Sequence, residues 1–191
     1  MTPIWDGNDL LSWYHPGLEV RESRISGFGV FSKQSIPDGQ PLMIWGGRFF
    51  TLEAVRAGEA APNSLAGYSE GIYLGQSIGD SKFYLDHFIN HSCRPNSWLG
   101  DVNVLISRGA ISPDEEVVSD YALWEIDNDW ILPVECACGV AECRVLVTGR
   151  DWMIPELQRS YRGHFLPCLE ERIKNLPKDR RNNECGKCAV G

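Results

Sequence analysis

Three closely spaced cysteines restrict the possible folds of this chain more than any other feature. The pattern is Cys136-x-Cys138-x4-Cys143, and Gly139 eases the tight turn between the cysteines. Three thiolates this close cannot all face an apolar core, whereas a structural zinc ion takes four ligands, usually Cys or His. A fourth ligand must then come from elsewhere, and Cys93 is one candidate. Three ordinary buried cysteines are the alternative, and a local zinc ribbon is disfavoured because no matching second pair lies nearby.

The other cysteines and the composition bound the class of protein. The odd count of seven cysteines, and the lack of a basic and apolar leader at Met1–Asp6, favour reduced thiols, so we expect a cytoplasmic protein. A length of 191 residues suits one domain with an appendage, and without an apolar run of about 18 residues we expect no membrane association. The net charge of -8 argues against direct nucleic-acid binding and is compatible with a cationic partner, such as a lysine-rich peptide.

The apolar pattern predicts a mainly β protein with many short strands. Turn signals such as Pro37-Asp38-Gly39 separate the apolar runs, and helix formers after Thr51 predict a helix over 51–57. Residues 58–70 are rich in Ala, Pro, Asn, Ser and Gly and predict a loop. The expected strands lie within residues 18–50, 71–85, 98–111 and 117–118.

The C-terminal part of the chain has a helical pattern instead. We expect helices over Asp151–Tyr161, with Pro155 in its first turn, and over Leu166–Leu176. An apolar stripe on the second helix predicts that it packs on the main body; the stripe consists of Leu169, Ile173 and Leu176. The polar stretch from Lys178 onward predicts a frayed tail.

Three further runs carry glycine or hydrogen-bonding side chains beside expected strands. They are Ser26-Gly27-Phe28-Gly29-Val30-Phe31, Phe88-Ile89-Asn90-His91-Ser92-Cys93-Arg94-Pro95-Asn96 and Glu115-Glu116-Val117-Val118-Ser119-Asp120-Tyr121. Each has a structural alternative: a glycine turn between strands, a satisfied polar Asn–His pair, and a buried tyrosine that anchors a hydrogen bond. The first run is not a dinucleotide fingerprint, because no third glycine and no helix follow it.

Taken together and in this order, these runs resemble SET-domain protein-lysine methyltransferases with a post-SET zinc motif. The resemblance covers about residues 18–148 and extends to compact, bacterial-like members. The Asn90–Asn96 run matches the N-H-S-C-x-P-N signature without a gap, and Cys136-x-Cys138-x4-Cys143 matches the post-SET pattern; both are highly specific. Gly27-Phe28-Gly29, Ile36-Pro37-Asp38-Gly39 and Asp120-Tyr121 match the G-x-G, I-P-x-G and D-Y motifs in the same order.

The resemblance implies a SET-domain fold of small curved β-sheets with a pseudoknot, a zinc-binding post-SET segment and C-terminal helices. Together with the residue pattern of the two ends, it divides the chain into four parts. These are an N-terminal arm (1–17), the SET domain (18–130), the post-SET zinc segment (131–148) and a C-terminal helical extension with a flexible tail (149–191).

The resemblance also implies two cofactors and a catalytic residue. One structural zinc ion would be held by Cys93, Cys136, Cys138 and Cys143. S-adenosylmethionine would lie in a pocket made by Ser26, Gly27, Phe28, Gly29, Trp45, Asn90, His91 and Tyr121. Tyr121 corresponds to the family's catalytic tyrosine, whose hydroxyl would orient the acceptor amine and the methyl group. The implied substrate is a lysine in a basic, histone-like or other protein segment.

Four features depart from the family pattern. Trp45-Gly46-Gly47 replaces Tyr-x-Gly, which keeps an aromatic wall and loses a hydroxyl, and His87 stands where Arg is common. Ser119 replaces the Phe or Tyr that often controls how many methyl groups fit, so we expect room for dimethyl or trimethyl products. Cys185-x2-Cys188 lies outside the pattern; an unpaired tail is the main interpretation and a second, shared metal site the minor one.

The leading hypothesis is an S-adenosylmethionine-dependent protein-lysine methyltransferase. A catalytically silent SET-fold module that binds a peptide or the cofactor is the first alternative, motivated by Trp45 and Ser119. A zinc-ribbon nucleic-acid binder is the second, and the net charge of -8 disfavours it. The location would be nuclear instead of cytoplasmic if the source is eukaryotic.

Overall fold

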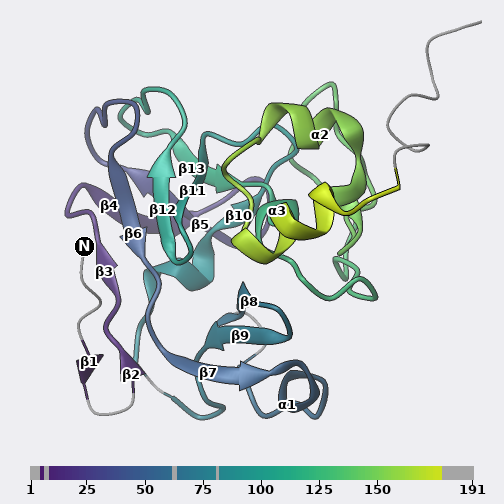
Figure 1. The fold of residues 1–191 in the computed structure, drawn as a ribbon. Helices are drawn as coiled ribbons and strands as arrows, with labels where there is room; N and C mark the ends of the chain where they lie inside the picture. The colour runs from purple at the N-terminus through teal and green to yellow at the C-terminus, as the bar shows by residue number, and fades with distance from the viewer. Residues whose placement is uncertain (1–4, 7–8, 62–63, 81, 178–191) are drawn as a thin grey trace, which may run out of the picture.

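The computed structural model describes residues 5–6, 9–61, 64–80 and 82–177, and it is mainly β, as expected. A strongly curved eight-stranded sheet forms the body of the protein (Figure 1). Seven of its strands follow the order β3-β6-β12-β11-β13-β5-β4, and β10 pairs with β13 in parallel. The bounds are β3 Trp13–Tyr14, β4 Leu18–Glu22, β5 Phe28–Ser32, β6 Pro41–Ile44, β10 Asn90–His91, β11 Ser97–Asp101, β12 Val104–Ser107 and β13 Glu116–Ser119.

A smaller sheet lies apart from the main one and has the order β7-β9-β8 (Figure 1). Its strands are β7 Arg48–Thr51, β8 Ala66–Ser69 and β9 Ile72–Gly75. The expected loop over 58–70 is therefore wrong at its C-terminal end. Gly67 packs closely against the carbonyl of Trp124, so the small side chains that resembled loop composition let a strand approach the segment after β13.

Short helices and a two-stranded ribbon complete the described chain. Helix α1, Leu52–Arg56, begins where expected, and the Thr51 hydroxyl caps it by accepting the Ala54 N–H at 3.2 Å. The ribbon pairs β1, Trp5–Asp6, with β2, Asp9–Leu10. The 3-10 helices are η2 Leu85–Phe88, η3 Tyr121–Leu123 and η4 Asp151–Met153.

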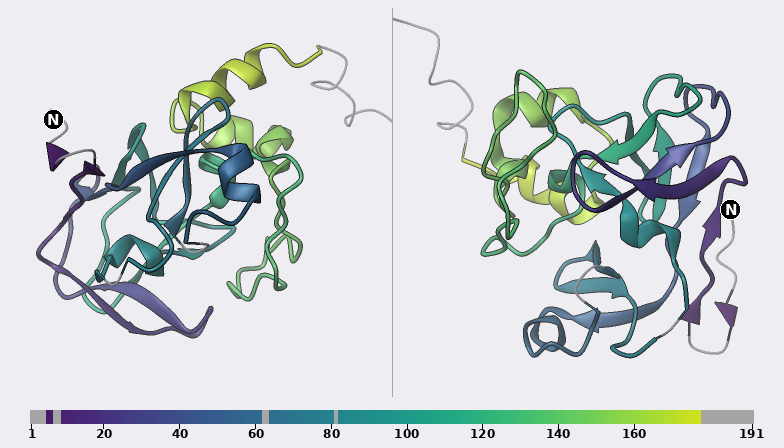
Figure 2. Two further views of the ribbon diagram at one scale, coloured as in Figure 1. Left: turned by 90° about the horizontal axis from the view of Figure 1, so that it is seen from below. Right: turned by 180° about the vertical axis from the view of Figure 1, so that it is seen from behind.

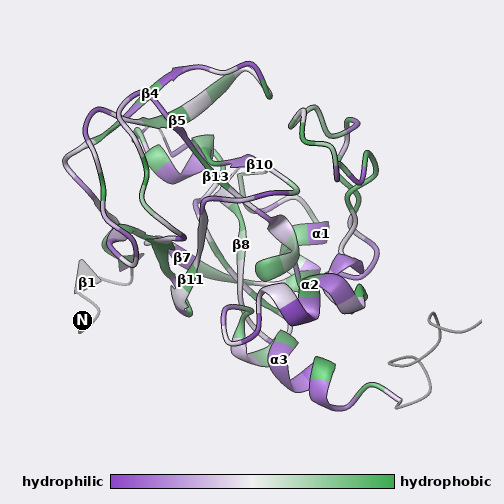
Figure 3. Cartoon of the chain, turned by 90° about the horizontal axis from the view of Figure 1, so that it is seen from above, coloured by the Kyte–Doolittle hydropathy of each residue, from purple (hydrophilic) through white to green (hydrophobic). Residues whose placement is uncertain are grey.

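Both expected C-terminal helices are present. Helix α2 spans Pro155–Ser160, with Pro155 in its first turn, and α3 spans Pro167–Lys174. Hydrophobic and hydrophilic bands alternate along α3 (Figure 3), and Leu169 is fully buried while Ile173 and Leu176 pack against the core. In both views of Figure 2, α2 and α3 (green to yellow) lie on the same side of the molecule as residues 124–150 (green).

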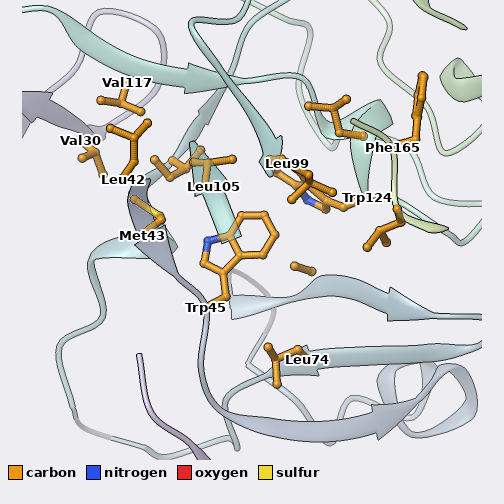
Figure 4. Close-up of a cluster of buried hydrophobic side chains, with 14 of the residues drawn as sticks. Val30, Leu42, Met43, Trp45, Leu74, Leu99, Leu105, Val117, Trp124 and Phe165 are labelled. Carbon is orange, nitrogen blue, oxygen red and sulfur yellow. The ribbon is translucent and has the colours of Figure 1, made fainter. Parts of the chain in front are cut away.

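One hydrophobic core extends between the two sheets, and Trp45 lies where they meet. Trp45 follows β6 and lies between Met43 and Leu105 of the main sheet and Leu74 of the small sheet (Figure 4). Its ring packs edge-to-face on Trp124, with the ring centroids 4.8 Å apart. Residues 124–150 contain no strand or helix, and an isolated bridge between Ile131 and Thr148 closes this segment into a loop. None of the helices in the described ranges has the length and apolar character needed to cross a bilayer.

Candidate active site and cysteine cluster

The four cysteines selected from the sequence meet at one place. The Sγ atoms of Cys93, Cys136, Cys138 and Cys143 all lie within 4.8 Å of one another. Zinc–sulfur bonds of about 2.3 Å in a tetrahedron require this kind of spacing. Burial raises the pKa of the Cys93 thiol to about 11, while backbone N–H groups overcome burial at Cys138 and lower its pKa to about 7. The donor set and its spacing fit one structural zinc ion.

Backbone amides after Cys143 support the cluster. The N–H of Arg144 donates to Cys93 Sγ at 3.3 Å, and the N–H of Val145 donates to Cys143 Sγ at 3.4 Å. Val145 adopts a φ of 62°, a left-handed conformation that is strained for a β-branched residue. The strained residue therefore lies in the same turn as the two amides that donate to sulfur.

Asn90 holds the glycine run that leads into β5. The Asn90 side-chain amide donates to the carbonyls of Phe28 at 3.0 Å and Ser26 at 3.3 Å, and to Glu116 Oε1 at 2.7 Å. Gly29 leaves room for this carboxylate, because a Cβ atom there would lie 2.1 Å from Glu116 Oε1. These contacts fix the backbone of residues 26–28 at the edge of a cavity.

Tyr121 is the first residue of η3, two residues after the end of β13, and its hydroxyl is held by a hydrogen bond. Its hydroxyl donates to the Ile89 carbonyl at 2.8 Å, and its backbone N–H donates to His91 Nδ1 at 3.3 Å. Burial raises the pKa of the Tyr121 phenol, so the hydroxyl is protonated at neutral pH. Burial also lowers the pKa of His91 to about 4, so the imidazole is neutral and can accept that bond.

Asp120, the neighbour of Tyr121, joins three segments of the chain. Its fully buried carboxylate accepts two hydrogen bonds from the Arg144 guanidinium, both at 2.7 Å, and a third from the Tyr161 hydroxyl at 3.1 Å. Arg144 Nε also lies 2.9 Å from Asp151 Oδ2. The cysteine cluster, the C-terminal helices and the D-Y motif are thus connected through one ion-pair network.

A large cavity adjoins these elements. It has a volume of about 770 Å³, within the range of small-molecule sites. Six of the eight predicted cofactor residues line it: Ser26, Gly27, Phe28, Trp45, Asn90 and Tyr121. His91 lines instead a neighbouring cavity of about 70 Å³, which shares Ser26, Asn90 and Tyr121 and reaches Cys136. Gly29 lines neither, because it lies within β5 against Glu116.

The walls of the large cavity are aromatic and acidic. Tyr121 contacts Trp124 and Trp130, with ring centroids 5.6 Å and 6.1 Å apart. Three carboxylate residues also line it, Asp86, Glu125 and Asp127, and the lining contains no lysine or arginine among the described residues. Aromatic faces and carboxylates attract cations, so this cavity suits a positively charged ligand.

Ser119 does not form the wall that its motif position indicated. The residue is fully buried, and its hydroxyl hydrogen-bonds to the Ser97 hydroxyl. It is absent from the lining of both cavities. The aromatic rings next to Tyr121 belong to His91, Trp124 and Trp130. The expectation of dimethyl or trimethyl products stays a prediction.

Sequence reasoning missed two polar residues at this site. Glu125 lies four residues after Tyr121, a spacing that puts two side chains on one face of a helical turn. Arg144 directly follows the last cysteine of the cluster. Spacing could have indicated Glu125, whereas only the three-dimensional contact with Asp120 identifies Arg144. Cys185 and Cys188 lie outside the described residues.

Comparison with known proteins agrees with this geometry. Residues 27–122, half of the chain, match the SET domain. Histone-lysine N-methyltransferase TRX1 of Oryza sativa subsp. japonica is 34% identical over 146 residues, which cover 68% of this chain and 14% of the relative. The H3 lysine-4 specific histone-lysine N-methyltransferase of Cryptococcus neoformans is 29% identical over 149 residues, which cover 66% of this chain and 9% of the relative.

Solved structures share the fold. Arabidopsis thaliana SUVH6 in complex with SAM matches 68% of this chain and 32% of its own, with a TM-score of 0.55 and 22% identity. KRYPTONITE in complex with mCHG DNA and SAH matches 68% of this chain and 28% of its own, with a TM-score of 0.51 and 26% identity.

The chain belongs to the SET-domain family. It spans a small part, 9% to 14%, of the length of the two relatives named above.

Proposed function

We propose that this protein is an S-adenosylmethionine-dependent protein-lysine N-methyltransferase. The observation that carries the proposal is the large cavity: the glycine run, Asn90 and Tyr121 line it together with aromatic and acidic walls and without a basic side chain among the described residues. Both reactants of such a transfer are cations, a sulfonium and a lysine ammonium. The family match supports the reaction class, and SAM and SAH complexes among the structural neighbours support the cofactor.

The cofactor would be held by the backbone of residues 26–28 together with Trp45 and Asn90. S-adenosylmethionine, when bound, supplies a methyl group on a positively charged sulfur. The carboxylates of the wall favour that charge, and the cavity volume of about 770 Å³ accommodates the cofactor with a side chain of the acceptor.

Tyr121 would orient the acceptor amine. Its hydroxyl is held at the Ile89 carbonyl, close to the aromatic faces of Trp124 and Trp130. Positioning and exclusion of water are the main contributions needed from the enzyme, because a neutral amine attacks a sulfonium methyl without a protein nucleophile. The zinc ion would hold residues 131–148 beside the cavity, to which Leu132, Pro133 and Val134 contribute.

The proposed substrate is a lysine in a basic protein segment, as the names of the relatives suggest for those proteins. The acidic wall and the net charge of -8 favour such a segment. A location in the cytoplasm, or in the nucleus of a eukaryote, stays a prediction.

The test is methyl transfer from radiolabelled S-adenosylmethionine to a core histone mixture and to a cell-protein pool, with cofactor binding measured separately by calorimetry. We expect label on lysine after hydrolysis and amino-acid analysis. Cofactor binding without label in either pool would favour the catalytically silent module, whereas absence of cofactor binding would contradict the methyltransferase proposal.

A further inference from the structure

Glu125 lies one helical turn after Tyr121 and shares its cavity. The backbone N–H of Glu125 donates to the Tyr121 carbonyl at 2.9 Å, which closes an i, i+4 turn. Both residues line the large cavity. The carboxylate of Glu125 and the phenol of Tyr121 therefore border the same cavity.

The carboxylate of Glu125 is held by two hydrogen bonds but is not paired with a positively charged side chain among the described residues. Its Oε1 accepts the Tyr73 hydroxyl at 2.5 Å and the Asp127 N–H at 2.8 Å. Burial raises the pKa of this carboxyl above its usual range. It has no ion pair within the part of the chain that the structure describes.

Two arginines of this region, Arg56 and Arg172, are bonded to other groups and do not pair with Glu125. Asp127 is itself paired with Arg56 of α1 at 2.7 Å, and that arginine is half exposed. Arg172 of α3 forms an ion pair with Glu70 and donates to the Ile126 carbonyl at 2.9 Å. Both arginines are thus occupied outside the lining of the cavity.

The proposed reaction needs a proton acceptor. Lysine has an unperturbed pKa of about 10.4, so it arrives as an ammonium, and its nitrogen has no free electron pair until a proton leaves. Tyr121 already donates its hydroxyl proton to the Ile89 carbonyl, and His91 accepts the Tyr121 N–H and faces the smaller cavity. Asp86, the other Tyr-paired carboxylate of the large cavity, is bonded to Tyr14 and lies in η2 rather than in the turn that carries Tyr121.

We propose that Glu125 binds the acceptor lysine as its ammonium and takes up the proton that the amine must lose. This inference rests on the proposed function. An N–H bond breaks at the ammonium, and an O–H bond forms on the Glu125 carboxylate. The electron pair left on nitrogen forms the new N–C bond, while the S–C bond of the methyl donor would break and leave its electron pair on sulfur as a neutral thioether. The proton returns to water when the product leaves.

The first test is the pH dependence of single-turnover methyl transfer to histone H3, between pH 6.5 and pH 9. The parent has its own base, so we expect a nearly flat profile. Glu125→Gln must wait for the ammonium to lose its proton to water, so its rate should rise about tenfold per pH unit. At neutral pH the loss should be about 10²- to 10⁴-fold, the usual contribution of general base catalysis.

Asp86→Asn is the matched control. It removes the other carboxylate that is paired with a tyrosine in the same cavity. Because Asp86 belongs to the acidic wall, the rate of this variant should fall, and only the slope of its pH profile should match that of the parent. A second readout needs no turnover: calorimetric binding of an H3 tail peptide and of its lysine-acetylated counterpart. The parent should prefer the unacetylated peptide, and Glu125→Gln should lose most of that preference.

The outcomes separate this inference from the proposed function. Transfer by the parent with an unchanged profile in Glu125→Gln would overturn the role of Glu125 and leave the methyltransferase intact. A steep profile in both Glu125→Gln and Asp86→Asn would also overturn it. If the parent transfers no methyl group, the proposed function fails, and an unaltered preference for the unacetylated peptide in Glu125→Gln would then show that Glu125 does not bind the ammonium.

Discussion

Replacement of Arg144 by methionine tests the ion-pair network that connects the cysteine cluster to the D-Y motif. Only 14% of the Arg144 side chain is exposed and none of the Asp120 side chain is. Arg144→Met would leave a buried carboxylate with the Tyr161 hydroxyl and the Ala122 N–H as its partners. Breaking a buried pair in this way costs about 3–5 kcal/mol. That is a large share of the roughly 5–15 kcal/mol by which a typical domain is stable.

Urea unfolding of the zinc-loaded protein measures this cost. With an m-value of about 1–3 kcal/mol/M, the midpoint should fall by roughly 1–5 M while the m-value stays the same. Arg159→Met, which removes the exposed ion pair of Arg159 with Glu156 on α2, should leave the midpoint close to that of the parent.

A double variant separates the stranded charge from other effects. Asp120→Asn combined with Arg144→Met removes the uncompensated carboxylate, so it should be more stable than Arg144→Met alone. Native mass spectrometry checks that each variant still carries one zinc ion. A cost below about 1 kcal/mol for Arg144→Met, or a double variant no more stable than the single one, would refute the reasoning.

Three further predictions follow from local geometry. Val145→Gly should stabilise the protein by about 1 kcal/mol in urea unfolding. Glycine relieves roughly 1–3 kcal/mol of backbone strain at φ 62°, which outweighs its greater loss of entropy on folding. A destabilised variant would contradict this. Gly29→Ala places a Cβ atom 2.1 Å from Glu116 Oε1 and should displace Asn90, which is bonded to that carboxylate. Calorimetry should show that S-adenosylmethionine binds at least about tenfold more weakly, a loss of about 1.4 kcal/mol. Unchanged affinity would count against the role of Asn90. Burial raises the pKa of Asp86 in the folded state above its unfolded value, so the protein loses stability as the pH rises through that raised pKa. The stability gained by Asp86→Asn relative to the parent should therefore grow between pH 3 and pH 7. A gain that shrinks with rising pH would contradict this sign.

Local signals in the sequence were sufficient for much of the fold. Thr51 as a cap, Pro155 in a first turn and the stripe that contains Leu169 each act within a few residues, and the structure contains the corresponding helices. The strand β8 was missed because three of its four residues are small, and its place depends on the close approach of Gly67 to Trp124. That approach is a tertiary contact that no window of the sequence reports.

The residues of the site also fall into two groups: those that a local pattern in the sequence indicates and those that only a tertiary contact reveals. The Asn90–Asn96 signature and the cysteine spacing pointed to the four cysteines that the structure brings together, whereas Tyr121 was chosen from the short D-Y match and its role stays a prediction. Arg144 and Ser119 could not be assigned in this way. The contact of Arg144 with Asp120 depends on how the segment after β13 folds back, and the direction of Ser119 depends on its pairing with Ser97. The domain boundaries and the individual cofactor contacts stay predictions.

The most direct test of the methyltransferase proposal compares two tyrosines. Tyr121→Phe and Tyr161→Phe each remove one largely buried hydroxyl, and only Tyr121 lines the large cavity. In single-turnover transfer from radiolabelled S-adenosylmethionine to histone H3, followed by identification of the labelled residue by mass spectrometry, the parent and Tyr161→Phe should label lysine. Tyr121→Phe should lose nearly all of that label while it still binds the cofactor. Equal labelling by Tyr121→Phe and the parent would contradict the assignment of this cavity as the site of methyl transfer.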